Sequence, residues 1–306
     1  MKRDLLSLND FSQEEILQIL DLAEKVKQDK TYAYDLLTGK SIGLVFQKPS
    51  NRTRTSFDVG INQLGGHCVY LAPQEINLGV RESTSDVAKT LSRYLDGIVA
   101  RTHTHQDVRD LAEHSSVPVV NGLCDLYHPC QALTDIFSIK EKLGSLEGVT
   151  MAYIGDGNNV CHSLMLACAK VGINLNIATP EGYEPDQKVV TLTDKYAQET
   201  GVKILVGYSA QDMVKNADVI YSDVWVSMGQ EDESHKRLTD FHNFQINREL
   251  VATANTNYIF MHCLPAHRGQ EVTEDIIDGE HSIVFDQAEN RLHTQKAILI
   301  FLMKSL

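Results

Sequence analysis

The stretch Thr150-Met151-Ala152-Tyr153-Ile154-Gly155-Asp156-Gly157-Asn158-Asn159 indicates the architecture of the chain. Its first five residues favour a buried strand, its glycines favour a tight turn, and the following apolar pattern from 160 to 171 favours a helix. A strand, a turn and a helix in this order are typical of a parallel sheet covered by helices. The stretch therefore predicts an α/β fold.

The same alternation extends in both directions from this stretch. A long helical pattern at Gln131–Leu143 ends at Gly144, close to the midpoint of the 306 residues, and marks a domain boundary. We predict two doubly wound parallel-sheet domains joined by interdomain helices, residues 1–145 and 146–288, with a last helix of about 289–306 that can pack on either domain. Strands are predicted at Ser41–Phe46, Cys68–Leu71, Gly97–Ala100, Val117–Val120, Thr150–Ile154, Leu175–Ala178, Ile204–Val206, Val219–Tyr221, Ile259–Met261 and Ile283–Phe285.

Composition excludes several classes of protein. The net charge of −13 and the absence of a long Lys/Arg run argue against nucleic-acid binding. No apolar run approaches the roughly 18 residues that span a bilayer, and the N-terminus does not resemble a signal peptide, so we expect no membrane partner and a cytoplasmic location. The six cysteines include no C-x-x-C pair, which argues against a zinc ribbon or a disulfide scaffold.

The segment Ser50-Asn51-Arg52-Thr53-Arg54 follows a predicted strand and opens a predicted helix. Main-chain N–H groups at a helix N-terminus attract anions, and arginine matches phosphate with a planar fork. Two arginines in the first turn oppose the helix dipole and therefore need an anion partner; the alternative is a simple helix cap with solvated arginines. Arg101 ends another strand at the same edge and is a third candidate contact.

The segment His128-Pro129-Cys130-Gln131 begins the long mid-chain helix. His128 and Gln131 are three residues apart, so both can reach one ligand, with imidazole and amide as hydrogen-bonding groups. The alternative is a helix start with proline in the first turn. Cys130 need not take part.

Two loops after later strands carry the remaining candidates. Asp223 and Ser227 follow a strand, where a carboxylate and a hydroxyl can hold an amino acid, and an exposed Trp225-Val226 pair favours a loop that closes on a ligand. The second loop is His262-Cys263-Leu264-Pro265-Ala266-His267-Arg268-Gly269. Ligands bind at the carboxyl ends of strands in open α/β sheets, and Cys263 is the cysteine whose context favours chemistry.

The turn Gly155–Asn159 contains only part of a dinucleotide fingerprint, since Val160 stands where the third glycine belongs. We interpret it as a structural turn that directs Asn158 or Asn159 toward a ligand. A nucleotide-dependent dehydrogenase stays open as an alternative.

Taken together, these motifs resemble those of the transcarbamylase family over essentially the whole chain, and most closely its ornithine-specific members. The phosphate motif S-T-R-T-R of that family appears as Ser50–Arg54, with asparagine at 51. H-P-C-Q appears as His128–Gln131, D-x-x-x-S-M-G as Asp223–Gly229, and H-C-L-P-A as His262–Ala266.

The resemblance implies a carbamoyl-phosphate-binding first domain, to which the final helix returns, and an amino-acid-binding second domain. It implies transfer of a carbamoyl group to the δ-amine of L-ornithine, giving citrulline and phosphate, without metal or cofactor, in a homotrimer or a multiple of trimers. It also implies the following roles. Carbamoyl phosphate is bound by Ser50, Asn51, Arg52, Thr53, Asn77, Arg101, His128, Gln131 and Arg291; ornithine is bound by Asn159, Asp223, Ser227, Met228, Cys263 and Leu264; and Arg101, His128, Asp223 and Cys263 are catalytic.

Asn77 occupies the position that family members contribute across the subunit interface, where glutamine or histidine is more usual. Carbamoyl transfer to putrescine or to an acylated ornithine, and a non-catalytic amino-acid sensor, remain alternatives to the ornithine reaction.

Overall fold

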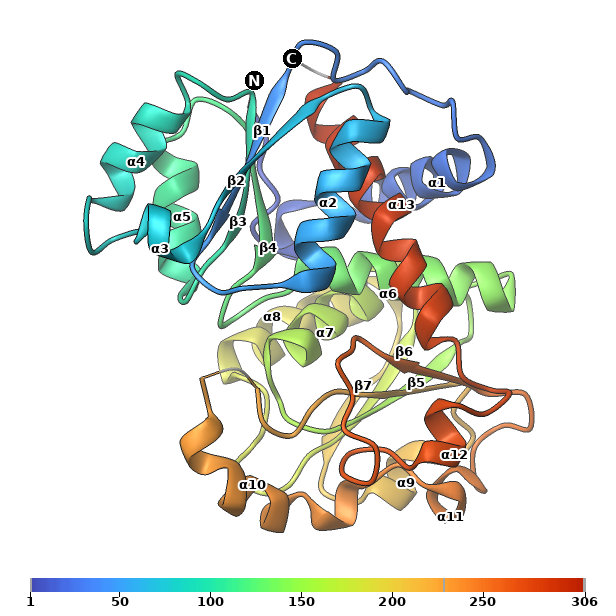
Figure 1. Cartoon of the computed structure of the whole chain (residues 1–306). Helices are drawn as coiled ribbons and strands as arrows, with labels where there is room; N and C mark the ends of the chain where they lie inside the picture. Colours follow the sequence, from blue (N-terminus) through green and yellow to red (C-terminus); the bar gives the residue numbers. More distant parts are fainter. Residues whose placement is uncertain (1, 228, 305–306) are drawn as a thin grey trace. The chain divides into compact units, whose positions relative to one another are not determined.

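A computed structural model describes residues 2–227 and 229–304 (Figure 1). The chain forms two compact units, residues 1–137 with 289–306, and residues 138–288. Helices α6 (Pro129–Leu143) and α13 (Val284–Met303) each begin in one unit and end in the other. The first division therefore lies inside α6, whereas the glycine at 144 places the expected boundary just after that helix.

The first unit contains a four-stranded sheet in the order β2-β1-β3-β4, with all strands parallel. Figure 1 shows α4 and α5 on one face of this sheet, and α1, α2 and α13 on the other. Its strands are β1 (Ser41–Phe46), β2 (His67–Leu71), β3 (Gly97–Arg101) and β4 (Val119–Leu123), and its other helices are η1 (Leu8–Asp10), α1 (Gln13–Gln28), α2 (Asn51–Gln63), α3 (Pro73–Ile76), α4 (Thr84–Leu91) and α5 (His105–His114).

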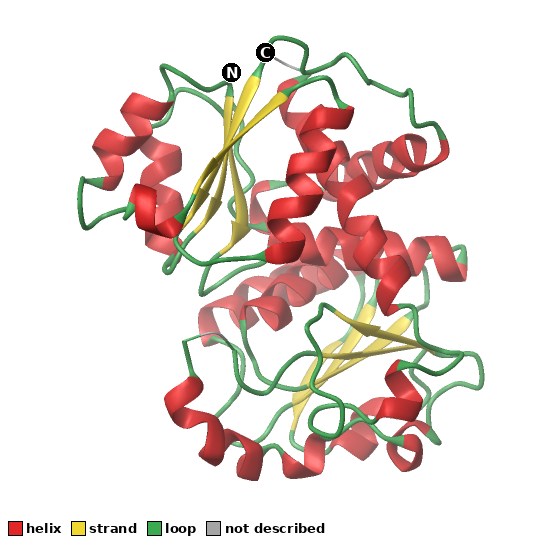
Figure 2. Cartoon of the chain, in the orientation of Figure 1, coloured by secondary structure: helices red, strands yellow, loops and turns green. Residues whose placement is uncertain are grey.

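The second unit contains a five-stranded parallel sheet in the order β7-β6-β5-β8-β9. Helices α7 and α8 cover one face, and α9, α11 and α12 cover the other, so the strands lie between two helical layers (Figure 2). Its strands are β5 (Thr150–Ile154), β6 (Asn174–Ala178), β7 (Ile204–Gly207), β8 (Val219–Ser222) and β9 (Ile259–His262), and its helices are α7 (Asn159–Val171), α8 (Gln187–Thr200), α9 (Ala210–Val214), η2 (Glu231–Glu233), α10 (Ser234–Asp240), η3 (His242–Phe244), α11 (Arg248–Val251) and α12 (Glu274–Ile277).

The predicted α/β class and two parallel sheets are confirmed, but two predicted strands differ from the structure. The strand predicted at Val117–Val120 begins at Val119, because Pro118 has no N–H to donate to a ladder. The strand predicted at Ile283–Phe285 is wrong, since α13 begins at Val284. The preceding residues make only a single bridge, Phe260 with Ser282, and a short apolar run does not distinguish a strand from the start of a helix.

Trp225 is a core residue of the second unit, so the expectation of an exposed Trp225-Val226 pair is wrong for the tryptophan. Its side chain is 4% exposed and stacks on Phe241 with ring centroids 5.9 Å apart. A buried indole contributes packing whether or not a ligand binds. Within the described residues, no helix combines the length and apolar character that a membrane span requires.

Candidate active site

The topology of each sheet creates one place where a ligand is expected. Chain order reverses between β1 and β3 in the first sheet and between β5 and β8 in the second. Ligands of open α/β sheets bind outside the carboxyl ends of strands at such switch points. The anion motif follows β1 and Arg101 ends β3, while Asn158 follows β5 and Asp223 follows β8. The predicted residues therefore gather at both switch points.

In the first unit, Ser50 caps α2, since its hydroxyl accepts a hydrogen bond from the main-chain N–H of Thr53 at 3.2 Å. This cap orients the first helical turn, whose N–H groups can face an anion. Asn51 is exposed, and its side-chain oxygen accepts a hydrogen bond from the Thr55 hydroxyl at 3.4 Å. The guanidinium of Arg54 lies 3.7 Å from the ring centre of Tyr70. Arg54 therefore has an aromatic partner within the chain, and its expected role toward an anion stays a prediction.

Three arginines surround His128, which is 6% exposed. Burial lowers the pKa of His128 well below its ordinary value, and the positive charges of Arg291, Arg101 and Arg52 lower it further. The imidazole is therefore neutral at physiological pH. A neutral imidazole among guanidinium groups can donate to an oxygen without adding a fourth positive charge, which suits a ligand that carries both a phosphate and a carbonyl group.

Arg291, from α13, is tied to two other predicted residues. One terminal nitrogen donates to the amide oxygen of Gln131 at 2.6 Å, and the other donates to the hydroxyl of Thr53 at 3.1 Å. The amide nitrogen of Gln131 in turn donates to Asp135 at 2.8 Å, and Asp135 is fully buried. Asp135 is a site residue that the motifs did not reveal. Its position one helical turn after Gln131 is the only sequence signal that pointed to it.

Asn77 lies apart from this cluster. It is exposed at the end of α3, in the left-handed conformation with φ 39°. Among the contacts of the described residues, none joins Asn77 to the arginines or to His128. A single chain therefore leaves this predicted ligand residue facing outward.

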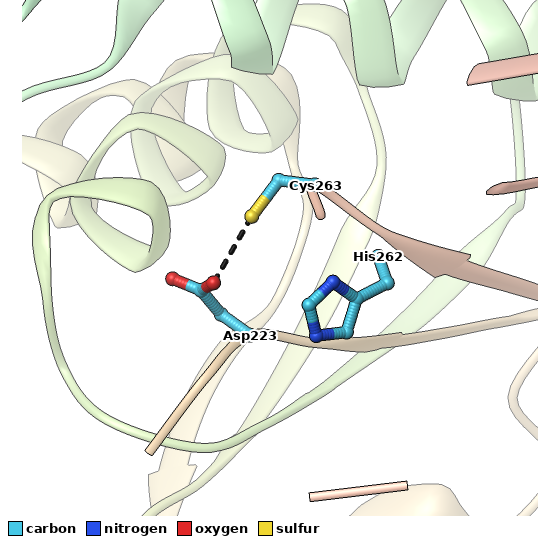
Figure 3. Close-up of side chains that lie close together, drawn as sticks. All are labelled: Asp223, His262 and Cys263. Atoms are coloured by element: carbon cyan, nitrogen blue, oxygen red, sulfur yellow. Dashed lines mark hydrogen bonds between the residues drawn. The ribbon is translucent and has the colours of Figure 1, made fainter. Parts of the chain in front are cut away.

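In the second unit, Asp223 is 5% exposed and accepts hydrogen bonds on both carboxylate oxygens. The Cys263 thiol donates to Oδ1 at 3.0 Å, the contact drawn in Figure 3, and the amide of Asn158 donates to Oδ2 at 2.8 Å. The side-chain oxygen of Asn158 meanwhile caps α7. Asn158 is therefore the residue of this turn that holds Asp223, and its cap position after β5 explains why; the role of Asn159 toward ornithine stays a prediction.

The other predicted residues of this unit come from the start of α7 and from the loops after β8 and β9. Asn159 is half-buried at the start of α7. The main-chain N–H of Ser227 donates to the Gln230 side chain at 3.0 Å. Leu264 is half-buried and adopts φ 56°, an uncommon conformation for a leucine. Met228 lies outside the described residues.

Asp223, His262 and Cys263 form a group whose ligand-type atoms lie within 4.8 Å of one another, a spacing that suits a metal ion. The imidazole, however, is already engaged. Its Nδ1 accepts a hydrogen bond from the main-chain N–H of Leu264 at 2.9 Å, and its Nε2 lies 3.3 Å from Glu271. Nδ1 is therefore already used, whereas Nε2 makes no hydrogen bond among the described residues and meets Glu271 only as a charge contact; the one hydrogen bond within the group joins Cys263 to Asp223.

The glycine turn after β5 is filled by the chain itself. A side chain at Gly157 would lie 2.3 Å from the main-chain nitrogen of Pro185, and the N–H of Gly157 donates to Tyr183 at 2.9 Å. In a dinucleotide fingerprint, the second glycine leaves room for the pyrophosphate. Here, main chain occupies that room, which argues against the dehydrogenase alternative.

Comparison with known proteins agrees with both halves of this description. Residues 3–141 match the family described as aspartate/ornithine carbamoyltransferase, carbamoyl-P binding domain, and residues 147–302 match the corresponding Asp/Orn binding domain. The ornithine carbamoyltransferase of Pyrococcus horikoshii is 52% identical over 98% of this chain and 96% of its own length.

Solved structures give the same result. The structure of ornithine carbamoyltransferase from Pyrococcus furiosus has a TM-score of 0.97 at 51% identity, covering 100% of this chain and 98% of that one. The anabolic ornithine carbamoyltransferase of Campylobacter jejuni has a TM-score of 0.95 at 36% identity, covering 100% of both chains.

Proposed function

Because the chain belongs to the aspartate/ornithine carbamoyltransferase family, we propose that it transfers the carbamoyl group of carbamoyl phosphate to the δ-amine of L-ornithine. The products are L-citrulline and phosphate. The observation that carries the choice of ornithine is the buried Asp223, paired with Cys263 and held by Asn158. A carboxylate in this setting provides an anionic partner for an ammonium group, and the loop that follows it retains the Ser-Met-Gly sequence of ornithine-specific members.

Carbamoyl phosphate is proposed to bind in the first unit. The start of α2 and Arg52 would hold the phosphate, as charge-assisted hydrogen bonds to guanidinium are among the stronger ones. Arg101, neutral His128 and Thr53 would face the carbamoyl oxygen, where negative charge develops during attack. Donors oriented beforehand toward such an oxyanion are usually the largest single contribution to catalysis. In this proposal Gln131 and Arg291 bind the carbamoyl end, with their mutual hydrogen bond keeping both in place.

Ornithine is proposed to bind in the second unit through Asn159, Asp223, Ser227, Met228, Cys263 and Leu264. Its δ-ammonium has a solution pKa near that of lysine, about 10.4, so a proton must leave before the amine can attack. Asp223 and Cys263, joined by a hydrogen bond, are the proposed groups that assist this step. The neutral amine then attacks the carbamoyl carbon, the C–N bond forms, and the C–O bond to phosphate breaks.

We also propose a homotrimer, or a multiple of trimers, located in the cytoplasm. An exposed Asn77, separate from the anion cluster of its own chain, supports a role toward a second copy. Six free cysteines agree with a reducing compartment. The resemblance requires neither metal nor cofactor.

Purified protein tests the proposed function in an assay of carbamoyl phosphate with ornithine, N-acetylornithine, putrescine and aspartate, with and without nicotinamide nucleotides. We expect citrulline from ornithine, with the other amines poor substrates and no nucleotide turnover. A kcat/KM for putrescine or acetylornithine equal to that for ornithine would contradict the assignment. Binding of ornithine without turnover would indicate a sensor instead.

A further inference from the structure

The loop after β9 is closed by a buried carboxylate that none of the motifs contains. Glu271 is 0% exposed. Its Oε1 accepts a hydrogen bond from the main-chain N–H of His267 at 2.6 Å and lies 3.3 Å from Nε2 of His262, whose side chain is also 0% exposed. A charged group removed from water is unfavourable unless nearby groups compensate it. The contacts of Glu271 are therefore the place to look for its role.

His262 extends this contact toward the proposed ornithine site. Its Nδ1 accepts a hydrogen bond from the main-chain N–H of Leu264 at 2.9 Å. An accepting Nδ1 places the ring proton of the neutral imidazole on Nε2, the nitrogen that faces Glu271. The main-chain N–H of His262 also donates to the side chain of Gln287 at 3.0 Å. The ring is thus held by a hydrogen bond at Nδ1, while Nε2, which makes no hydrogen bond in the part of the chain that the structure describes, faces the carboxylate of Glu271 at 3.3 Å as an electrostatic contact.

Leu264 is the residue whose placement this arrangement determines. Its φ of 56° lies in the left-handed region, which a leucine adopts only where its surroundings require it. Cys263 stands between His262 and Leu264, and its thiol donates to Asp223 at 3.0 Å. The direction of the chain at Leu264 therefore decides whether the thiol meets Asp223.

We propose that Glu271 and His262 are positioning residues for carbamoyl transfer. Glu271 orients the His262 ring, the ring holds the N–H of Leu264, and this contact keeps Cys263 against Asp223. Neither residue needs to touch a substrate. The inference rests on the proposed function, because it assumes that Asp223 and Cys263 serve ornithine. It goes beyond that function by assigning a role to two residues outside the predicted ligand set.

Two variants separate the links of this chain of contacts. Glu271→Gln keeps the size of the side chain and removes its charge. His262→Asn retains an oxygen near the position of Nδ1, which can accept from Leu264, but cannot reach Glu271. His267→Ala is the matched control, since that ring is half-exposed and lies 4.0 Å from Glu271, whereas the main-chain N–H that donates to Glu271 is kept in the variant.

We expect Glu271→Gln and His262→Asn each to lower kcat for ornithine by roughly 10- to 100-fold, the scale of loss from a small misplacement of reacting groups. The Kd of carbamoyl phosphate, whose proposed site lies in the other unit, should stay within about twofold of wild type, as should all constants of His267→Ala. The double variant should lose little more than the worse single variant, because both changes break one series of contacts.

Wild-type kcat in both single variants would overturn the inference. So would a loss of carbamoyl phosphate affinity that matches the loss of kcat, since that pattern indicates general damage to the fold. If Glu271→Gln does not fold, His262→Asn alone decides between these results. A wild-type chain that makes no citrulline would instead refute the proposed function on which the inference rests.

Discussion

Replacing Asp223 with asparagine is the most direct test of the proposed ornithine site. The carboxylate accepts from the Cys263 thiol and the main-chain N–H of Val224 on Oδ1, and from Asn158 on Oδ2. Asparagine keeps the shape but has only one accepting atom. Whichever way the amide turns, an NH₂ group then faces at least one former donor. We expect the fold to lose about 1–3 kcal/mol, the cost of a buried polar group left without its partner.

The loss of activity should be larger than this loss of stability suggests. A hydrogen bond to a charged group contributes about 1.5–3 kcal/mol, or roughly 10- to 100-fold in kcat/KM. If Asp223 also helps to remove the proton, a further 10²–10⁴-fold falls on kcat. Citrulline formation at saturating carbamoyl phosphate, followed across ornithine concentration, separates the two contributions. Urea unfolding of the same protein measures the stability term.

Asp278→Asn is the matched control for this experiment. Asp278 also lies in the second unit, but it is exposed and pairs with Arg268 at the surface, and exposed pairs contribute little. Its variant should keep wild-type kinetics. Near-wild-type turnover of Asp223→Asn at saturating ornithine would remove Asp223 from the chemistry and refute the reasoning.

Three further predictions concern other residues. Asn51→Thr should change the Kd of carbamoyl phosphate by no more than about 1 kcal/mol, whereas Arg52→Ala should cost about 1.5–3 kcal/mol; calorimetric titration checks the order, and a larger loss in Asn51→Thr would overturn the phosphate assignment of the motif. The pKa of His128 is lowered in the folded chain, so the unfolded chain binds more protons below about pH 6.5 and stability falls as pH decreases through that value. His128→Gln should lose less stability than wild type between pH 7.5 and 5.5 in urea unfolding, and equal losses would contradict the burial of a neutral imidazole. Emission from Trp225, the one tryptophan of the sequence, should resist quenching by acrylamide until the chain unfolds, and strong quenching of the native protein would contradict its packing against Phe241.

Periodicity and turn residues predicted the fold because they act locally. The strand and helix of Thr150–Val171 follow from apolar spacing and from the cap at Asn158, and the structure has both. Local signals were insufficient where two structures share one pattern. The apolar run at Ile283–Phe285 suits either a strand or the start of a helix. In the structure, the residue before the run, Ser282, forms an isolated bridge with Phe260, and α13 begins at Val284.

The site was predictable where residues touch the proposed ligands and much less so where residues touch one another. Strand ends identify Arg101 and Asp223, because a parallel sheet brings such ends to one edge. Asp135 and Glu271 are buried carboxylates whose partners appear only after the chain folds. The position of Trp225 was misjudged for the same reason: Arg237, twelve positions later in the chain, donates to its main-chain oxygen and holds the segment against the core.

The contrast between the two units follows from the charges that each proposed ligand carries. In the first unit, burial and the neighbouring guanidinium groups lower the pKa of His128 and keep it neutral, so the cluster gathers positive charge for a phosphate while retaining an uncharged donor for a carbonyl oxygen. In the second unit, Asp223 places negative charge beside a thiol and an amide, an arrangement that suits an amine. The phosphate dianion is disfavoured in the second unit because it would meet the negative charge of Asp223. The ammonium group is disfavoured in the first unit because it would meet the positive charge of the arginines. The two switch points therefore suit ligand groups of opposite charge, although both lie in the same kind of parallel α/β sheet.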